Sequence, residues 1–165
     1  MPPETDNLKL EDLFNADQKE RGQVLSTTAA VAALKRSDAA RRKELTEMLG
    51  RGEVNTARDL YHAGVIFLHG GEPKEFLSAH RLATMSALQG HRGSRWLVAA
   101  GLDRFLMSIG LPQVYGTQFE RNEEENRYQL RLPIDDSAVL HFEKRFFDVP
   151  SVIERLSQLN RRVAG

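Results

Sequence analysis

The sequence predicts a mainly α-helical fold, in which an antiparallel bundle of repeat-like helical hairpins is followed by a C-terminal β-hairpin and terminal helices. Three observations predict this class. Residues 56–110 contain three apolar segments of helix length, separated by glycines. Beyond Pro112 the period of the apolar residues changes from about 3.6 residues, typical of helices, to about 2 residues, which is typical of strands. Helical spacing then returns over residues 137–163.

Composition limits the class of protein. The 165 residues fit one domain with one core. The 23 basic and 23 acidic residues give a formal charge of +0, which favours neither nucleic acid nor a membrane as a partner. The chain has no cysteine, which excludes disulfides, thiolate metal ligands and a cysteine nucleophile. It has no signal-peptide pattern and no run of about 18 apolar residues, so we expect a soluble, cytoplasmic protein.

We expect one domain over residues 1–165. It begins with a frayed tail over residues 1–8 and a helical core over residues 9–110. A β-hairpin over residues 113–133 and terminal helices over residues 137–163 follow. The core opens with an amphipathic helix whose apolar positions are Leu10, Leu13, Phe14, Val24 and Leu25. Asp17 and Arg21 fall inside this apolar stripe, four residues apart, so we expect an ion pair that faces the core.

A second helix is predicted over residues 38–49, with Ser37 as its cap. It again places an acid and a base on the apolar side, Asp38 with Arg41 or Arg42. The alanine-rich run before it, residues 26–36, has no clean period and fits either a continuation of the helix or a loose connection.

The central helix of the prediction begins at Thr56, which has the spacing of a capping box with Asp59. The residues that follow are apolar nearly all round, the pattern of a helix that is covered on most sides. Gly70 and Gly71 end this helix, and we expect the left-handed cap that glycine favours. Three polar residues share one stripe of it, Asp59, His62 and His69.

Two further helices complete the predicted core. Pro73 suits the first turn of one, which stops at Gly90 and carries His80 in its apolar stripe. The other covers residues 94–110 and carries Asp103 in the middle of its apolar stripe. A carboxylate in that position has its pKa raised by burial or lowered by a neighbouring arginine.

The β-hairpin is predicted over residues 113–133, with a charged turn at 121–126. Alternation marks its two strands at Tyr115, Thr117 and Phe119, and at Tyr128, Leu130 and Leu132. Asp136 or Ser137 then caps a short helix, and Pro150 opens a last one. The apolar face of the last helix is formed by Val152, Ile153, Leu156, Leu159 and Val163.

A partial repeat pattern lies within the helical core. The pattern Y-x-x-G-x-x-x-x-x-G, followed by A-x-x-L-x-x-x-A-x-x-x-G, falls on Tyr61, Gly64, Gly70, Ala79, Leu82, Ser86 or Ala87, and Gly90. It resembles Sel1-like repeats, relatives of the tetratricopeptide repeats, although Ser94 stands where such repeats usually have alanine. Little more than one repeat is present and an array needs about three, so we do not expect a solenoid.

Three longer motifs cover more of the chain. They are Y-H-A-x-x-I-F-x-H-G at 61–70, W-L-x-A-x-x-x-D-R at 96–104 and G-x-P-Q-x-Y-G-T-Q at 110–118. Together they resemble an uncharacterised bacterial family of single-domain proteins. The sequence departs from that family at Leu68, where glutamine is more usual. The resemblance implies a shared fold and a shared site, and it brings no known activity.

Polar residues on the apolar faces predict one polar pocket, because ionisable groups inside a protein are costly unless they are paired. For ligand binding we select Asp17, Arg21, Asp59, His62, Arg104, Gln113, Tyr115 and Gln118. If the protein is an enzyme, we select Asp103 and His69 as its acid–base groups. No metal site is predicted, because the spacing of the histidines and Asp59 matches no strong ligand motif. No cofactor is predicted either, because the glycines match no nucleotide-binding motif.

Each candidate also has a structural interpretation. Asp103 fits an ion pair between two helices, with an arginine such as Arg21 or Arg104. His69 fits an imidazole that bonds the last carbonyls of its helix. His62 and His80 each fit a core histidine with one hydrogen bond.

The segment at residues 116–118 has two interpretations as well. It suits a backbone brought close to a ligand, with Gln118 presenting its amide. It also suits an edge-strand bend in which Tyr115 packs and Gln118 braces a helix end.

The sequence supports functions of three classes. The first is a helical module that binds a small polar ligand, a peptide or a protein partner. The second is a small cysteine-free hydrolase or transferase, in which Asp103 and His69 exchange protons. In that enzyme Arg21 or Arg104 would anchor an anionic substrate, and Tyr115 or Gln118 would orient it. The third is an immunity or regulatory partner protein, which rests on size and family type.

Overall fold

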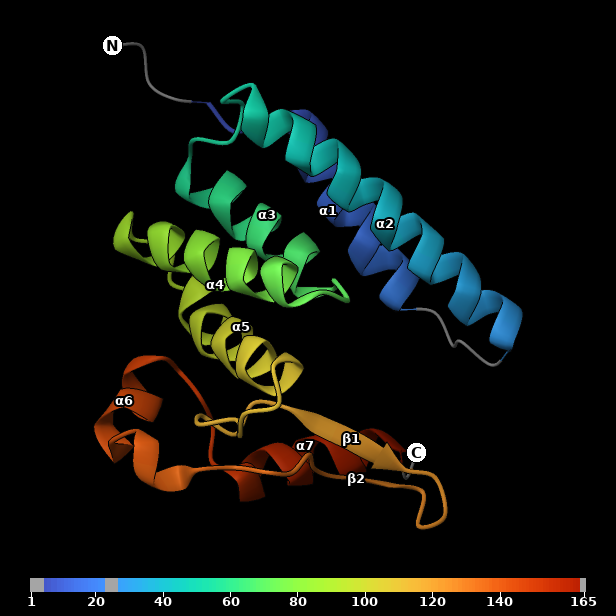
Figure 1. Ribbon diagram of the computed structural model, residues 1–165, viewed down its shortest axis with the longest axis vertical. Helices are drawn as coiled ribbons and strands as arrows, with labels where there is room; N and C mark the ends of the chain where they lie inside the picture. The colour runs from blue at the N-terminus through green and yellow to red at the C-terminus, as the bar shows by residue number, and fades with distance from the viewer. Residues whose placement is uncertain (1–4, 23–26, 164–165) are drawn as a thin grey trace.

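The computed structural model describes residues 5–22 and 27–163, and it is mainly helical with one two-stranded antiparallel sheet, as predicted. The long helices come first, as α1 (Leu8–Arg21), α2 (Thr28–Gly50), α3 (Ala57–Leu68), α4 (Pro73–Leu88) and α5 (Ser94–Ser108). The later elements are β1 (Phe119–Asn122), β2 (Arg127–Leu130), the 3-10 helix η1 (Asp136–Ala138), α6 (His141–Phe146) and α7 (Val152–Val163). In Figure 1, α1 and α2 lie along one side, α3 to α5 fill the middle, and the hairpin lies at the other end with α6 and α7. None of the helices in these described ranges is long and apolar enough to span a lipid bilayer.

α3 is the centre of the bundle, because α1, α2, α4 and α5 all pack against it. Its N-terminus has the predicted capping box. Thr56 Oγ1 accepts a hydrogen bond from Asp59 N at 3.0 Å, and the Asp59 carboxylate accepts one from Thr56 N at 3.3 Å. Gly64 lets the neighbouring helices approach closely, since a Cβ there would lie 3.0 Å from the Leu97 side chain. α3 and α4 form a hairpin, with Pro73 in the first turn of α4 as predicted.

α2 begins earlier than predicted, so the expected cap at Ser37 is wrong. Thr27 is the cap, and its side chain accepts a hydrogen bond from Ala30 N at 3.1 Å. The alanine-rich run continues the helix because alanine has the highest helix propensity of all residues. α1 ends at Arg21. Two of its predicted apolar positions, Val24 and Leu25, lie outside the described residues.

The glycines after α3, Gly70 and Gly71, do not form the predicted left-handed cap. The cap residue is His69 at φ −87°, and neither glycine has a positive φ. Gly70 is needed for its size, since a Cβ there would lie 2.6 Å from Glu75 Cβ. Left-handed glycines follow α4 and α5 instead, Gly90 at φ 95° and Gly110 at φ 81°.

The β-hairpin is shorter than predicted. β1 and β2 are antiparallel, with Phe119 opposite Leu130. Residues 115–118 form no strand, because they fold around the side chain of Asp103 through hydrogen bonds to its carboxylate. The strand predicted there is therefore wrong. Leu132 is 70% exposed and lies beyond β2.

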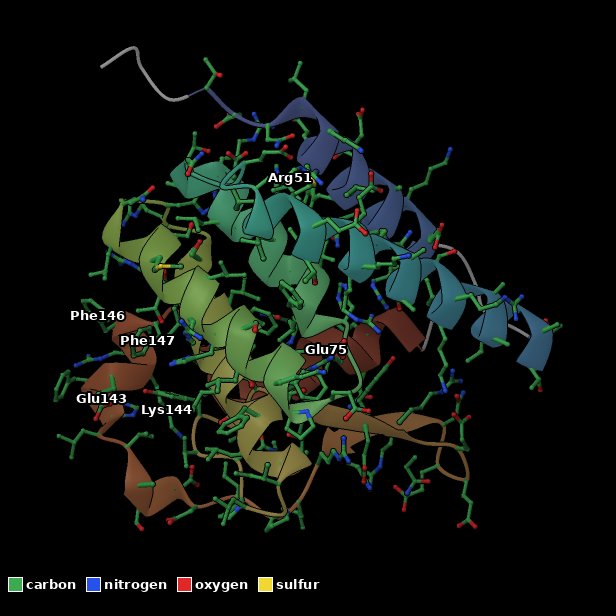
Figure 2. All side chains as sticks on the ribbon, turned by 45° about the horizontal axis from the view of Figure 1, so that its top comes forward. Arg51, Glu75, Glu143, Lys144, Phe146 and Phe147 are labelled. Carbon is green, nitrogen blue, oxygen red and sulfur yellow. The ribbon has the colours of Figure 1, made fainter. Side chains whose placement is uncertain are left out.

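The segment after the hairpin returns to the helical core through α6. The cap of η1 is Asp135, one residue before the predicted position, and its Oδ1 accepts a hydrogen bond from Ser137 N at 3.0 Å. Figure 2 shows Phe146 and Phe147 at the end of α6. The Phe147 ring packs edge-on against Tyr115, with the ring centroids 5.5 Å apart, and so joins α6 to the segment after α5.

α7 packs against β2. The Asn160 side chain accepts a hydrogen bond from Tyr128 N at 2.6 Å and donates one to Tyr128 O at 3.2 Å. Ile153 was expected on the packed face of this helix, but it is 82% exposed. Nothing is described for the side chain of Val163.

Candidate functional site

The predicted site residues occupy three places in the structure. An ion-pair cluster between α1, α2 and the end of α3 contains Asp17, Arg21 and His69. A network between α5 and the start of the hairpin contains Asp103, Arg104, Gln113 and Gln118. The remaining residues lie in packing or capping positions and are Asp59, His62 and Tyr115.

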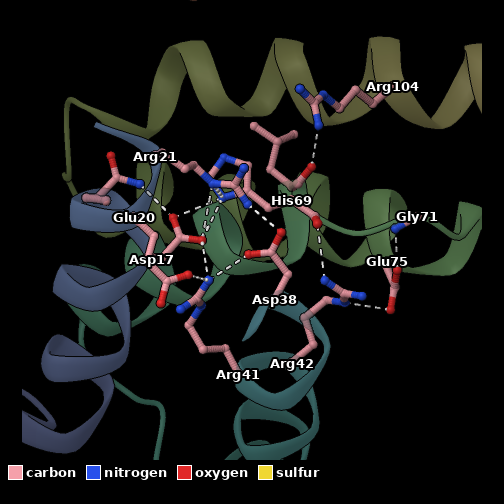
Figure 3. A network of polar contacts seen from close by, with 12 residues as sticks. Asp17, Glu20, Arg21, Asp38, Arg41, Arg42, His69, Gly71, Glu75 and Arg104 are labelled. Atoms are coloured by element: carbon pink, nitrogen blue, oxygen red, sulfur yellow. Dashed lines mark hydrogen bonds and ion pairs between the residues drawn. The ribbon is translucent and has the colours of Figure 1, made fainter. Parts of the chain in front are cut away.

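The ion-pair cluster neutralises its arginines within the protein (Figure 3). Arg21 Nε lies 3.3 Å from Asp17 Oδ1, which is the pair predicted from their spacing. Arg21 Nη2 donates to Asp38 Oδ2 at 2.8 Å, and Arg41 Nη2 donates to Asp38 Oδ1 at 2.7 Å. Arg41 also donates to Glu20 at 3.0 Å. Three carboxylates thus face two guanidiniums, which is how buried charges are usually accommodated.

His69 lies at the edge of this cluster. Its Nδ1 is 3.0 Å from Asp17 Oδ2 and 2.8 Å from Arg21 Nε. Burial is the largest cause and lowers the pKa of His69. The contact with Asp17 raises it, the charges of Arg21 and Arg104 lower it, and the net shift is downward. The imidazole is therefore neutral at pH 7. A neutral Nδ1 either donates to Asp17 or accepts from Arg21, so these two contacts compete.

Asp17 is ionised in spite of its burial. Burial raises the pKa of the carboxyl group. The hydrogen bond from His69 and the charge of Arg21 lower the pKa by more, so the net shift is downward. A histidine beside an ionised carboxylate is the arrangement that general-base chemistry uses.

Two arginines, rather than the imidazole of His69, bond the last carbonyl groups of α3 (Figure 3). Arg42 Nη1 donates to His69 O at 3.1 Å, and Arg104 Nη1 donates to Leu68 O at 2.6 Å. Arg42 Nε also lies 2.8 Å from the Glu75 carboxylate. The interpretation in which His69 itself bonds these carbonyls is wrong, since its Nδ1 contacts the ion-pair cluster.

Asp103 is fully buried, and its carboxylate holds the segment that follows α5. Oδ1 accepts from Val114 N at 2.8 Å and from Tyr115 N at 3.0 Å. Oδ2 accepts from Thr117 N at 2.9 Å and from Thr117 Oγ1 at 2.7 Å. A carboxylate has about four acceptor positions, so none remains for a substrate proton. The arginine partner predicted for Asp103 is wrong, because its partners among the described residues are loop amides and a hydroxyl. These contacts favour a structural task for Asp103, and its selection as a catalytic group stays a prediction.

A chain of hydrogen bonds connects Asp103 to Arg104. Thr117 Oγ1, which donates to Asp103, accepts from Gln118 Nε2 at 2.9 Å. Gln118 Oε1 in turn accepts from Arg104 Nε at 2.9 Å. Gln113 fixes the Gln118 backbone, since its Oε1 accepts from Gln118 N at 2.9 Å and its Nε2 donates to Gln118 O at 3.2 Å. Asp103 therefore positions the amide that orients the Arg104 guanidinium.

Arg104 lines a cleft of about 410 Å³ between the start of α4, α5 and the hairpin. We call it the arginine cleft and define it by Phe76, Arg104, Gln118, Phe119 and Arg131. Among the residues that the structure describes, no carboxylate pairs with Arg104 or Arg131. Burial lowers the pKa of Arg104, and the charges of Arg21 and Arg131 lower it further. Its guanidinium is held by neutral acceptors alone in the described part of the chain.

A smaller hollow of about 240 Å³ lies on the other side of Arg104. His69 lines it, together with the aromatic side chains of Tyr61 and Trp96. Gln118 lines the arginine cleft and His69 lines the smaller hollow, while Arg104 contributes to both. The single pocket that the sequence predicts is therefore two spaces that share one arginine.

Three selected residues take structural positions. Asp59 is the third residue of α3, completes its capping box with Thr56, and is fully buried. His62 stacks on Phe14 with the ring centroids 4.1 Å apart, and burial lowers its pKa. The hydrogen bond predicted for this histidine is wrong for its Nδ1, which is buried without a partner among the described residues. Tyr115 donates its backbone N–H to Asp103 and packs its ring on α6. His80, read as a core histidine, places its Nδ1 2.9 Å from Val98 O.

Sequence reasoning missed three residues of the arginine cleft, Phe76, Phe119 and Arg131. Phe76 is one of the apolar residues of the helix that begins at Pro73, and Phe119 belongs to the alternating pattern of the first predicted strand, so the spacing of neither residue indicates a ligand site. Arg131 lies just beyond β2, where a charged residue is ordinary. Its backbone O accepts a hydrogen bond from Gln113 Nε2, a contact between residues 18 positions apart that no local pattern reveals.

The two spaces offer different chemistry. The arginine cleft has a fixed cation, an oriented amide and apolar walls, which suits an anion with an apolar body. The smaller hollow has a neutral imidazole beside a carboxylate.

Within residues 5–22 and 27–163, no group of three or more His, Cys, Asp or Glu side chains is arranged to hold a metal ion. Comparisons of the chain with protein-family models, with curated proteins and with solved structures gave no match.

Proposed function

We propose that this protein is a helical module that binds a small carboxylate or phosphate in the arginine cleft. The observation that carries the proposal is Arg104, a largely buried guanidinium that meets a carbonyl and an amide but no carboxylate within the described residues. A charge in such a place is costly unless it is paired. An anionic ligand would supply the missing pair.

The shape of the cleft supports a particular kind of ligand. Arginine presents a planar fork of N–H groups that matches a carboxylate or a phosphate. Arg104 uses Nε and Nη1 for protein contacts, and its Nη2 has no partner among the residues described. Arg131 adds a second cation, while Phe76 and Phe119 offer apolar walls. We therefore infer a ligand with one anionic group and a small apolar body.

The site is organised before a ligand arrives. Gln118 is held at its amide by Thr117 and at its backbone by Gln113. Thr117 is held in turn by the buried Asp103. Because the guanidinium is oriented by this chain, a ligand would not have to order it, and a preformed site loses less entropy on binding.

Isothermal titration calorimetry with benzoate, phenyl phosphate and the neutral benzyl alcohol tests the proposal. We expect both anions to bind and benzyl alcohol not to bind. Arg104→Gln should weaken anion binding by about tenfold or more, since a hydrogen bond to a charged group contributes about 1.5–3 kcal/mol. Arg131→Gln should weaken it by only about threefold, because this residue is exposed.

Arg42→Gln is the matched control. This arginine also bonds a carbonyl at the end of α3, but it lies outside the arginine cleft. Its substitution should leave anion affinity unchanged. The proposal fails if benzyl alcohol binds as well as benzoate, or if Arg104→Gln and Arg42→Gln lose affinity equally.

A second candidate function, a hydrolase or transferase, is favoured by one observation. His69 is neutral, lies beside the ionised Asp17, and lines a hollow that Arg104 also lines. In this candidate His69 accepts a proton, Asp17 orients it and Arg104 anchors an anionic substrate. Hydrolysis of p-nitrophenyl acetate and p-nitrophenyl phosphate tests it. We expect His69→Gln to abolish turnover and Arg104→Gln to raise KM, and the candidate is lost if wild-type protein turns over neither compound faster than buffer.

We also propose that the protein works in the reducing cytoplasm, which the lack of cysteine supports. Its motifs support a place in the bacterial family that they resemble. Two of these motifs end in Arg104 and Gln118, which line the arginine cleft. A shared ligand in that family is therefore part of the proposal.

A further inference from the structure

A groove on the opposite face of α4 is separate from the arginine cleft. It runs between α2 and α4, both of which pack on α3. It consists of two hollows of about 590 and 240 Å³ that share Leu49 and Ser78. On the α4 helical wheel, Lys74 and Ser78 face this groove and Phe76 faces the arginine cleft. We call this surface the α2–α4 groove.

The floor of the α2–α4 groove is apolar. Phe67 from α3 and Leu49 from α2 form one part, and Leu82 and Met85 from α4 extend it. Met85 is 44% exposed, which is large for an apolar side chain. The lining positions recur every three or four residues over 39–49 of α2 and over much of α4, which gives a length of about 15 Å, or about three helical turns.

The rims of the groove are basic. Lys43 lies on the α2 side, and Lys74 and Arg81 lie on the α4 side, all three exposed. None of them forms an ion pair with another described residue. The single carboxylate in the lining, Glu75, is already paired with Arg42 at 2.8 Å, on the side of α4 that faces α2 (Figure 2). Since the whole chain has a formal charge of +0, this is a local excess of positive charge.

We propose that the α2–α4 groove binds an amphipathic helix of a partner protein that has acidic residues beside its apolar stripe. A helix in such a groove presents apolar side chains at every third or fourth position, which matches an apolar floor about three turns long. Its flanking carboxylates meet the rim formed by Lys43, Lys74 and Arg81. This charge match selects an acidic helix over a basic one and speeds its association.

Fluorescence anisotropy tests the proposal with labelled synthetic helices of about 14 residues. One has a leucine stripe flanked by glutamates, the second replaces glutamate by lysine, and the third has the first composition in scrambled order. We expect the first helix alone to bind, with an affinity that falls as salt is added. Lys43→Glu combined with Lys74→Glu and Arg81→Glu should weaken binding at least tenfold and transfer the preference to the lysine helix.

Two controls separate the groove from general charge and from misfolding. Lys19→Glu combined with Arg92→Glu and Arg145→Glu reverses three exposed charges elsewhere and should change the affinity less than twofold. Met85→Ser should weaken binding about fivefold with an unchanged melting temperature, because Met85 is already half in solvent.

Several results would overturn the proposal. It fails if the acidic helix does not bind, if the scrambled helix binds equally well, or if the groove triple variant keeps its affinity while remaining folded by circular dichroism. It also fails if sedimentation shows a dimer that the groove variant dissociates, because the occupant is then a second copy of this chain. Benzoate binding at the arginine cleft is measured in the same variants, and it should not change.

Discussion

Arg42 and Arg104 both donate to carbonyl groups at the end of α3, but within the described part of the chain only Arg42 also meets a carboxylate. Arg42 bonds His69 O at 3.1 Å and lies 2.8 Å from Glu75. Arg104 bonds Leu68 O at 2.6 Å, and its second contact is the amide of Gln118 at 2.9 Å. Both arginines therefore bond the end of α3, but the charge of Arg42 is neutralised by Glu75, whereas Arg104 has no carboxylate partner among the described residues.

The presence of a carboxylate at Arg42 and not at Arg104, within the described residues, indicates which of the two arginines the proposed ligand would meet. A helix C-terminus carries only a partial negative charge, so it compensates a guanidinium incompletely. On the Arg42 side Glu75 completes the compensation. On the Arg104 side burial lowers the pKa of the guanidinium, and the positive charges of Arg21 and Arg131 lower it further. The proposed function therefore places the anion on the Arg104 side rather than on the Arg42 side.

Asp103→Ala should give the largest loss of stability, and it disrupts the contacts that hold Arg104 while leaving those of Arg42 in place. It leaves the amides of Val114, Tyr115 and Thr117 without their acceptor in a buried place. We expect the free energy of unfolding, measured with urea, to fall by at least about 3 kcal/mol. Benzoate binding should be lost with it, because Gln118 loses its anchor.

The exposed Asp12→Ala serves as the control for Asp103→Ala. Its side chain makes no hydrogen bond with another described residue, and it should change the unfolding free energy by less than about 0.5 kcal/mol. Equal effects of the two substitutions would mean that the carboxylate of Asp103 does not hold the segment after α5.

Arg42→Gln and Arg104→Gln test the comparison directly through thermal and urea unfolding. Arg42→Gln removes the cationic partner of the half-buried Glu75, which keeps its hydrogen bonds from Gly71 N and Glu72 N, and should cost about 1–2 kcal/mol. Arg104→Gln removes a charge that has no carboxylate partner among the described residues, so it should be neutral or stabilising, as is common at ligand sites. If Arg104→Gln destabilised the protein more than Arg42→Gln, the carbonyl of Leu68 and the amide of Gln118 would be sufficient to compensate the charge of Arg104 without a carboxylate.

The pH dependence of stability should sharpen the comparison by a smaller amount. The pKa of His69 is lowered in the folded protein, so below its ordinary value of 6.5 the unfolded chain binds a proton that the folded chain does not. Stability is therefore full above pH 6.5 and falls as the pH drops, with a slope of at most about 1.4 kcal/mol per pH unit for one proton. His62, whose pKa burial lowers, contributes in the same direction.

Unfolding measured between pH 7 and pH 5 checks this slope in each arginine variant. Arg104→Gln removes a positive charge that acts on His69, so its slope should be shallower than that of the wild type. Arg42→Gln should keep the wild-type slope. His69→Gln should leave the part due to His62. A slope that is identical in all four proteins would contradict the assigned position of Arg104 beside His69.

The features that sequence predicted well are local. The capping box joins residues three apart, and the pair of Asp17 and Arg21 joins residues four apart on one helix face. Sequence does not decide whether the first half of α2 is helical, because residues 28–37 are largely exposed and no buried stripe marks them as helical. Alanine propensity, which has no period, forms that part of the helix.

The candidate site depends on contacts that sequence does not display. Asp103 stands out in the sequence as a charge on an apolar stripe, but its backbone partners are N–H groups 11 to 14 residues away, and every residue except proline has one. The contact from Arg104 to Leu68 O spans 36 residues and also ends on the backbone. Side-chain patterns therefore identified the charged residues and could not identify what they hold.

The Asp103 carboxylate also gives the segment after α5 an unusual place in the dynamics of the protein. Loop amides ordinarily exchange their hydrogens with solvent through small local openings. The amides of Val114, Tyr115 and Thr117 all end on one buried anion, so opening any of them exposes the others or leaves that charge unsolvated. In hydrogen–deuterium exchange these three should be as slow as the amides of α3, and the segment then opens only when the helical bundle itself does.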